Sequence, residues 1–256
     1  MSFADLPLIR GAPAATAAQM AEVDRVSTTE LGITVEMLME NASRQVAATA
    51  RELLDGVAGK HVVALVGSGN NGGDAAGALR HLANWGATVH ALAAAPQEKL
   101  RPTTRVQLGR LLLSTADWRV GRVTEATAGA EKTGTALRAA DLVIDGLLGY
   151  SARGAPRGEV LRLVEASAQA DRPVLAVDIP SGIDPDSGVA PGAAVRAAAT
   201  VTLALPKAGL LTAAAREYVG ELILADIGIP AAAFDRVGLD ARGVFRDGDL
   251  VRVGRQ

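Results

Sequence analysis

The sequence contains no cysteine, few aromatic residues and no long apolar run. Without cysteine, the chain has no means of forming disulfides, thiolate metal sites or cysteine nucleophiles. Only 3% of its 256 residues are aromatic, so a core must be built from Ala, Val, Leu and Ile. No run is long enough to span a membrane. The N-terminus lacks a basic segment followed by an apolar one, so we expect no signal peptide and a cytoplasmic protein.

Charge and histidine content exclude further classes of protein. The net charge is −2 and there is no basic run, which predicts no nucleic-acid partner and no membrane partner. The histidines His61, His81 and His90 form no cluster with metal-ligand spacing, so zinc is not expected. A bound cation would be a hard one, held by oxygens of Asp, Asn, Ser or backbone carbonyls.

Short apolar runs alternate with helical patterns along the chain. Two helices are predicted first, capped by Thr16 and Thr34. Most of the later runs are β-branched or rich in leucine and do not alternate strictly, which is typical of strands buried on both faces of a parallel sheet. These runs are residues 61–66, 88–94, 141–148, 173–179, 199–205 and 220–227. We expect one α/β domain over residues 1–256: a three-layer αβα sandwich with a mainly parallel central sheet, N-terminal helices and a small hairpin after Pro230.

Residues 67–74 read GSGNNGGD between a predicted strand and a predicted helix. They match the dinucleotide pattern G-x-G-x-x-G, but nothing acidic lies between Asp74 and Glu98 to read a ribose. A Walker A loop is excluded because no Lys-Ser/Thr pair follows the glycines. A helix that begins near Asp74 would still offer N–H groups to a phosphate. Asp74 itself is either a ligand contact or the N-cap of that helix.

Two further carboxylates follow apolar runs, Asp145 in LVIDGLLG and Asp178 in VLAVDIPSGIDPDSG. Ligands of doubly wound sheets bind at the carboxyl ends of the strands. A carboxylate at the edge of a dry core needs a partner, a cation or a catalytic role, and capping of the next turn is the alternative. Beside the glycine loop, the two favour a site. Asp184 and Asp186 are explained by turn formation.

Six segments together resemble the NAD(P)H-hydrate epimerase family, also called the YjeF N-terminal domain family. They are MENASRQVA, GSGNNGGDAAGALRHL, DLVIDGLLG, AVDIPSGIDPDSG, ATVTLALPKAGL and VGELILADIGIP, spread over residues 16–230. The resemblance implies a Rossmann-like fold, a homodimer and a stand-alone isomerase. That enzyme interconverts the R and S forms of NADH and NADPH hydrated at C6 of the nicotinamide ring. A separate S-specific dehydratase then restores the cofactor.

The resemblance also implies roles for particular residues. Asp178 should contact the reacting ring, and it is our first choice as the catalytic acid and base. One potassium ion per subunit would take oxygens from Asn71, Asp145 and Ser181. The implied substrate-binding residues are Asn70, Asn71, Gly72, Gly73, Asp74, Gly149, Tyr150, Ser151, Ala152, Arg153, Gly154, Ala155 and Asp178.

The chain departs from the family pattern at three places. Ser43 and Ala75 stand where glycine is usual, and the loop reads LGYSARGAPRG where it often reads LGTGL. Tyr150 and Arg153 therefore change the shape and charge near the substrate, and Arg153 is a candidate phosphate contact. Lys207 is a candidate partner for a phosphate or a carboxylate, or one half of a structural ion pair.

Two other functions stay open at this point. A non-catalytic nucleotide-binding or scaffolding module of the same fold is the first, although the presence of Asn71, Asp145 and Asp178 favours catalysis. A redox enzyme that uses NAD or flavin is the second, and the missing ribose acid disfavours it. The reaction itself has two open routes, an iminium-like cation or a ring-opened aldehyde.

Overall fold

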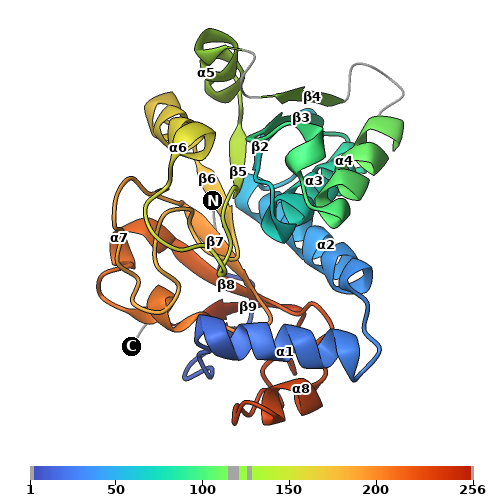
Figure 1. Ribbon diagram of the computed structural model, residues 1–256, viewed down its shortest axis with the longest axis vertical. Coiled ribbons are helices and arrows are strands. Elements are labelled where there is room, and N and C mark those ends of the chain that lie inside the picture. The colour runs from blue at the N-terminus through green and yellow to red at the C-terminus, as the bar shows by residue number, and fades with distance from the viewer. Residues whose placement is uncertain (1–2, 115–120, 126–128, 255–256) are drawn as a thin grey trace.

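A mainly parallel sheet forms the middle of the molecule in the computed structural model, which describes residues 3–114, 121–125 and 129–254 (Figure 1). Within these residues the sheet has nine strands in the order β1-β9-β8-β7-β6-β5-β2-β3-β4, and its antiparallel pair is β8 with β9. The strands are β1 (Leu8–Ile9), β2 (His61–Val66), β3 (Thr88–Ala93), β4 (Gly121–Glu125), β5 (Leu142–Gly146), β6 (Val174–Val177), β7 (Ala199–Leu203), β8 (Glu221–Ala225) and β9 (Leu250–Val253).

Helices cover both faces of this sheet, which confirms the three-layer prediction. Helices α2, α3 and α4 pack together on one face, and α5 pairs with α6 on the other (Figure 1). The helices are α1 (Ala17–Thr29), α2 (Val35–Leu54), α3 (Asn70–Asn84), α4 (Pro102–Ser114), α5 (Ala130–Arg138), α6 (Gly158–Ala170), α7 (Arg216–Val219) and α8 (Ala231–Asp235), with 3₁₀ turns η1 (Gln97–Lys99) and η3 (Ala208–Leu211). Helix α1 contacts α8 and lies with it at the lower end of the view (Figure 1).

Strand β2 shows why the apolar runs do not alternate with polar residues. Its Val62 and Ala64 belong to the core beneath α2 and α3, whereas Val63 and Leu65 belong to the core beneath α5 and α6. All four side chains are fully buried. Both faces of the strand are covered, so both sets of alternate positions must be apolar.

The two predicted N-caps are confirmed. The hydroxyl of Thr16 accepts a hydrogen bond from the backbone N–H of Gln19 in a capping box at the start of α1. The hydroxyl of Thr34 accepts from the backbone N–H of Met37 at the start of α2. Each bond satisfies an N–H group that the helix itself leaves free.

Three local features differ from the expectations drawn from the sequence. Strand β4 was not predicted, because its segment GRVTE lacks an apolar run. The chain after Pro230 does not form its own hairpin; β9 instead pairs with β8 and β1, where the edge of β8 offers free backbone groups. Helix α3 begins at Asn70 with Gly69 as N-cap, so Asp74 lies inside the helix.

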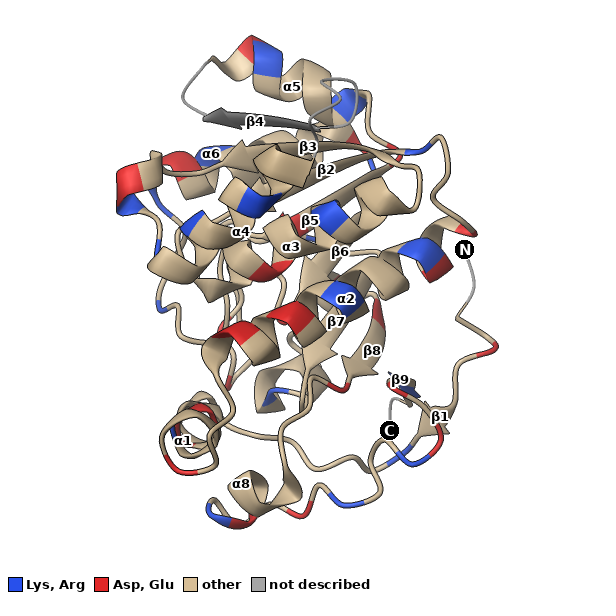
Figure 2. Cartoon of the chain, turned by 90° about the vertical axis from the view of Figure 1, so that its right-hand side faces the viewer, with Lys and Arg blue, Asp and Glu red and all other residues tan. Residues whose placement is uncertain are grey.

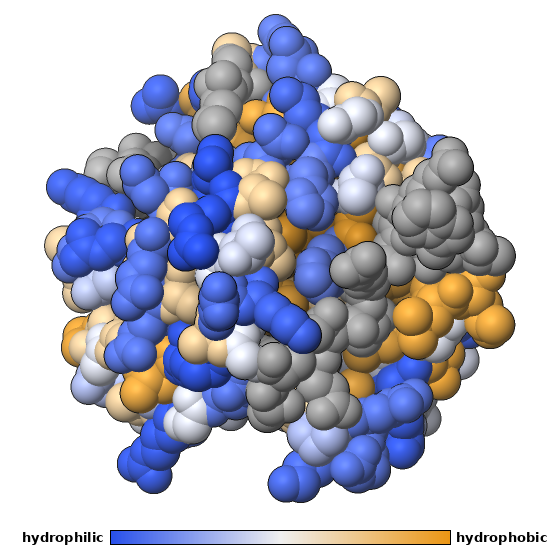
Figure 3. Space-filling model, turned by 90° about the horizontal axis from the view of Figure 1, so that it is seen from above, coloured by the Kyte–Doolittle hydropathy of each residue, from blue (hydrophilic) through white to orange (hydrophobic). Residues whose placement is uncertain are grey.

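The described surface carries mixed charge and exposed apolar residues. Figure 2 shows acidic and basic residues interspersed over the helices and loops. Seen from above, the molecule is largely hydrophilic, and apolar side chains gather on the side where α4 lies (Figure 3). The exposed apolar residues of α4 are Val106, Leu112 and Leu113, the last of them 83% exposed. None of the described helices has the length and apolar character needed to cross a membrane.

Candidate active site

The carboxyl ends of the central strands open into a cavity of about 660 Å³. The chain runs from β2 to β3 and β4 on one side of the sheet, and β5 continues on the other side of β2, so the order reverses there. Such a switch point is the usual ligand site of an open α/β sheet, and this volume is typical of small-molecule sites. The polar residues that line the cavity and carry the argument below are Asp24, Asp74, Arg101, Tyr150, Asp178 and Lys207.

Asp178 and Lys207 form a buried ion pair in this cavity. The Nζ of Lys207 donates to the Oδ1 of Asp178 and, at 2.9 Å, to the carbonyl oxygen of Leu203. The lysine is only 1% exposed. Since the charge of either partner would be costly alone at this depth, each requires the other. The sequence left three options open for Lys207, and in the structure it pairs with a carboxylate.

The backbone of Asp178 is unusual. Its φ is +64°, in the left-handed region that non-glycine residues seldom adopt. The backbone N–H donates to Val201 at 2.7 Å, and the carboxylate accepts weakly from Thr202 and Leu203 at 3.4 and 3.3 Å. The bend after β6 therefore turns this carboxylate toward β7 and Lys207. Such strain is common at functional sites.

Asp145 is also fully buried, but its partners are neutral. Its Oδ2 accepts from the backbone N–H of Ser181 at 2.8 Å, and its Oδ1 accepts from the Ser181 hydroxyl at 2.7 Å. The backbone N–H of Leu147 adds a longer bond of 3.2 Å to Oδ1. Burial raises the pKa of Asp145 and these hydrogen bonds oppose the rise. Among the described residues no cationic side chain forms an ion pair with this carboxylate.

The three residues expected to hold an ion meet around Leu148. The Nδ2 of Asn71 donates to the carbonyl oxygens of Leu148 and Val177 at 2.9 and 3.0 Å, and the backbone N–H of Leu148 donates to the Ser181 hydroxyl at 2.9 Å. Ser181 in turn binds Asp145. A carboxylate, a hydroxyl and two carbonyl oxygens thus lie close together, a donor set that fits a hard cation.

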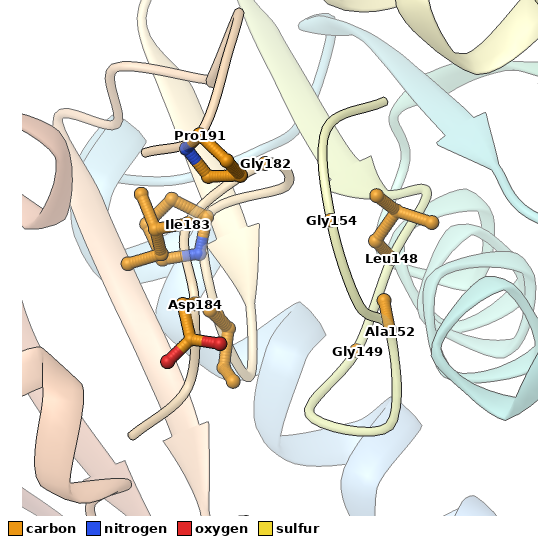
Figure 4. A pocket seen from close by; sticks show the side chains of 10 residues that line it. Leu148, Gly149, Ala152, Gly154, Gly182, Ile183, Asp184 and Pro191 are labelled. Atoms are coloured by element: carbon orange, nitrogen blue, oxygen red, sulfur yellow. The ribbon is translucent and has the colours of Figure 1, made fainter. Parts of the chain in front are cut away.

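A small pocket of about 10 Å³ lies beside this cluster, between the loop after β5 and the segment after β6. Figure 4 shows Leu148, Gly149 and Ala152 on one side of it and Gly182 and Ile183 on the other. Its volume is that of about one water molecule. The carboxylate of Asp184 accepts two backbone N–H bonds from the turn that follows, as expected from its sequence context.

Asp74 projects from α3 into the cavity. The structure shows no hydrogen bond or ion pair to its carboxyl group among the described residues. Burial raises the pKa of Asp74 well above its usual value, and the charges of Asp178 and Asp24 add to the rise, against the opposing charge of Lys207. The capping interpretation of Asp74 was therefore wrong, because Gly69 is the N-cap and no side chain caps this helix.

The glycines of the loop allow close packing of the backbone. A Cβ on Gly67 would overlap the carbonyl oxygen of Leu147, and a Cβ on Gly72 would overlap that of Gly67. A Cβ on Gly73 would lie 2.7 Å from the Met39 side chain. Gly72 and Gly73 are absent from the described wall of the cavity, which Asn70, Asn71 and Asp74 do line.

The comparisons with known proteins agree with this architecture. The family model for the YjeF-related protein N-terminus matches residues 35–209, about two thirds of the chain. The chain belongs to this family. The NAD(P)H-hydrate epimerase of Dehalogenimonas lykanthroporepellens is 39% identical over 236 residues, which cover 91% of this chain and 90% of that protein. The epimerase of Pirellula staleyi is 38% identical, with 84% and 92% covered.

Longer relatives and a solved structure complete the comparison. The bifunctional NAD(P)H-hydrate repair enzyme Nnr of Moorella thermoacetica is 36% identical over 84% of this chain, but the match covers only 40% of that enzyme. The crystal structure of yeast ynu0 superimposes with a TM-score of 0.76 over 94% of this chain and 99% of that one, at 22% identity. That likeness confirms the expected fold.

Within this YjeF-related chain, the loop at residues 149–155 only partly lines the cavity. Gly149, Tyr150, Ser151 and Ala152 line it, whereas Arg153, Gly154 and Ala155 do not. The guanidinium of Arg153 folds back on its own loop and donates to the carbonyl oxygens of Tyr150 and Ala152, both at 2.8 Å. Arg153 thus bonds its own loop through Nη1 and is absent from the cavity wall that the structure describes.

Two cavity residues were missed from the sequence. Arg101 follows η1 and lies on the cavity wall, where it offers a cation that Arg153 does not. Asp24 lies on α1, one turn after the buried Met20 and next to the buried Val23. A carboxylate on the apolar face of a helix was the available signal for Asp24; no local pattern marked Arg101.

Proposed function

We propose that this protein is an NAD(P)H-hydrate epimerase, an isomerase that interconverts the R and S forms of hydrated NADH and NADPH. The buried pair of Asp178 and Lys207, placed in the cavity at the switch point of the sheet, carries the proposal. The 39% identity to an epimerase over most of both chains supports the reaction and the substrate. The nucleotide is a substrate here, which agrees with the lack of an acidic residue to read its ribose.

The reaction needs a proton donor and a proton acceptor next to C6 of the ring. When the C6 hydroxyl group leaves as water, it takes a proton, and the lone pair of the ring nitrogen stabilises the resulting iminium-like cation. Water then adds to the other face and loses a proton, which inverts the centre. In this proposal Asp178, held by Lys207, accepts the proton of the incoming water.

Asp74 gives the site a second carboxyl group with a different environment. Because its pKa is raised by burial, Asp74 favours the protonated form, whereas Asp178 has an ammonium partner. Two carboxyl groups whose surroundings differ in this way commonly divide the roles of acid and base. We assign Asp74 to donation toward the leaving hydroxyl and Asp178 to activation of water.

We also propose that one potassium ion per subunit binds at Asn71, Asp145 and Ser181. Asp145 is a buried carboxylate with hydrogen-bond donors but no ion pair within the described chain, and its neighbours offer oxygen atoms. A bound cation would offset the buried charge of Asp145 and order the loop that begins at Leu148. The donors present, which suit a hard ion, support this role.

Two further partners complete the proposal. The S product would pass to a separate S-specific NAD(P)H-hydrate dehydratase, and the bifunctional repair enzymes support this link, because the chain matches only about 40% of their length. We also propose a homodimer. The exposed apolar residues of α4 offer a surface for the second copy.

A non-catalytic nucleotide-binding module is the alternative function. A module of that kind would need the cavity but not a costly ion pair inside it, so the buried Lys207 favours catalysis. A dehydrogenase is disfavoured because no acidic residue occurs from Ala75 to Gln97. Purified protein should therefore cause no absorbance change with NAD(P)(H) and common alcohols, aldehydes or keto acids.

The deciding experiment mixes the protein with R and S hydrates and an S-specific dehydratase. An epimerase gives fast and complete recovery of the reduced cofactor, followed by absorbance. Recovery of the S portion alone, with the R portion left to its spontaneous rate, would refute the epimerase and favour the non-catalytic module. The dehydratase without this protein is the control.

A further inference from the structure

The loop after β5 carries an aromatic residue on the wall of the cavity. Tyr150 is the aromatic member of the cavity wall among the described residues. Only 3% of the chain is aromatic, so a ring at this place cannot be ascribed to composition. Aromatic side chains contribute large contact area with little conformational freedom, and their faces favour planar or cationic partners.

Hydrogen bonds close the loop on itself, and one of its side chains bonds to another element of the described chain. Ala152 donates its N–H to Gly149 at 3.0 Å, and Arg153 binds two carbonyl oxygens of the same loop. Among the described residues, the hydrogen bond that joins loop 149–155 to another element runs from the Tyr150 hydroxyl to the Oδ2 of Asp24, at 2.5 Å. Since Asp24 lies on α1, this bond spans the cavity from the sheet to that helix.

The tyrosine ring lies beside the reacting groups. The Nζ of Lys207 lies over the ring, 5.9 Å from its centre, and the same nitrogen binds Asp178. Burial raises the pKa of Tyr150, and the charge of Asp24 adds to the rise, so the hydroxyl stays a donor. Burial also raises the pKa of Asp24, and the bond from Tyr150 opposes the rise.

We propose that Asp24 is a positioning residue, which holds Tyr150 and its loop over the cavity so that the tyrosine ring lies against the hydrated nicotinamide ring. This inference rests on the proposed epimerase function. A ring fixed beside Asp178 and Lys207 keeps the nicotinamide ring in one plane while the C6–O bond breaks. Its electron-rich face also suits the positive charge that develops on the nicotinamide ring.

Three variants distinguish the effect of the hydrogen bond between Tyr150 and Asp24 from the effect of the tyrosine ring. Tyr150→Phe keeps the ring but loses the bond, and Asp24→Ala removes the acceptor but keeps tyrosine. Each should lower kcat/KM by about tenfold, the usual effect of one hydrogen bond to a charged group. The kcat/KM of the double variant should fall no further than that of either single variant, because the two substitutions break the same hydrogen bond. Tyr150→Ala removes the ring as well and should be the most impaired.

A matched control and a second measurement keep the test independent of activity. Asp171→Asn changes a surface carboxylate that does not line the cavity, and it should behave as the wild type. Hydrogen exchange followed by mass spectrometry should show faster exchange of residues 149–155 in Tyr150→Phe and Asp24→Ala but not in the control. Circular dichroism melts check that each variant is folded.

Several outcomes would overturn the inference. Wild-type kcat/KM in Tyr150→Phe would show that the bond does not matter, and additive losses in the double variant would show that the two residues act separately. Lost activity without faster loop exchange would remove the positioning role of Asp24. If the wild type fails to interconvert the hydrates, the proposed function fails, and the exchange data alone then decide whether Asp24 holds the loop.

Discussion

Asp145 and Asp178 stand at corresponding places at the ends of neighbouring strands, and their surroundings differ. Both are buried and follow apolar residues. Asp145 receives hydrogen bonds from a serine and from backbone N–H groups, whereas Asp178 is paired with the ammonium group of Lys207. Asp178 also has a left-handed backbone, which Asp145 does not. The same sequence signal thus marks a candidate ion ligand in one strand and a candidate catalytic group in the next.

The two carboxylates have different partners because different segments of the chain face the two strand ends. Asp145 faces the backbone after β6, where N–H groups and the Ser181 hydroxyl are available. Asp178 faces the end of β7, where the chain turns and brings Lys207 back. Carboxylates in such unlike settings should respond differently to the same substitution, to salt and to pH.

The largest effect is expected for Asp178→Asn. Turnover should fall on the order of 10²–10⁴-fold, the usual contribution of a positioned acid or base. Asparagine tolerates the left-handed backbone, but Lys207 loses its counter-charge, so stability should fall by about 3–5 kcal/mol. NMR exchange spectroscopy of the hydrates and a thermal melt measure the two effects.

A second substitution separates the two effects of Asp178→Asn. Lys207→Met in that background removes the unpaired charge, so most of the lost stability should return while turnover stays low. Near-normal turnover in a folded Asp178→Asn variant would remove this carboxylate from catalysis. Asp74, which also lines the cavity, would then be the better candidate for the chemistry.

The next effect concerns potassium and Asp145. If the ion binds there, KCl should raise the melting temperature of the wild type above that in choline chloride at equal ionic strength. A hundredfold excess over Kd corresponds to about 2.7 kcal/mol of stabilisation. Asp145→Asn should lose this potassium-specific gain, whereas Asp171→Asn, on the surface, should keep it. An equal gain in both variants would place the ion elsewhere.

Asp74 differs from Asp145 and Asp178 because its carboxyl group has no hydrogen-bond or ion-pair partner among the described residues. The pH dependence of stability tests whether burial raises its pKa. Because the pKa of Asp74 is raised on folding, its contribution to stability is fully present below about pH 3.8 and is lost as the pH rises through the folded-state pKa. Asp74→Asn should therefore give no gain at low pH and a growing gain above it. The gain is roughly 1.4 kcal/mol for each unit by which the pKa is raised.

Urea unfolding of Asp74→Asn between pH 3.5 and 8 measures this dependence, with Asp171→Asn as the control. Turnover should fall in the Asp74 variant even though it is more stable, since a proton donor has been removed. A gain that is independent of pH would mean that burial does not raise the pKa of this group.

The smallest expected effect is on stability. It compares the two hydroxyl groups that donate hydrogen bonds to Asp145 and Asp178. Ser181→Ala removes a 2.7 Å bond to Asp145 and a 2.9 Å bond from the backbone N–H of Leu148, and it should cost about 2 kcal/mol, since a hydrogen bond to a charged group alone contributes about 1.5 kcal/mol or more. Thr202→Val removes a contact of 3.4 Å to Asp178, which Lys207 already satisfies, and should cost roughly 0.5 kcal/mol or less. Urea unfolding measures both, and equal costs would contradict the contrast between the two sites.

Much of the fold could be read from local patterns. The run HVVALV is strand β2 to the residue, and Thr16 and Thr34 cap the first two helices as predicted. These features depend on periodicity, branching at Cβ and capping, which neighbouring residues supply. Strand β4 has no such pattern of its own, because its place at the edge of the sheet is given by its pairing with β3.

The candidate site shows even more clearly what local sequence patterns do not predict. The sequence by itself determined that carboxylates and a bare glycine loop would gather at the carboxyl edge of a parallel sheet, because strand direction fixes where such residues emerge. Only the tertiary structure decided that Lys207 would neutralise Asp178, that Asp145 would receive neutral donors, and that Asp24 would reach Tyr150 across 126 positions of the chain. Local pattern encodes which face a residue occupies. The partner it meets there depends on how distant segments pack.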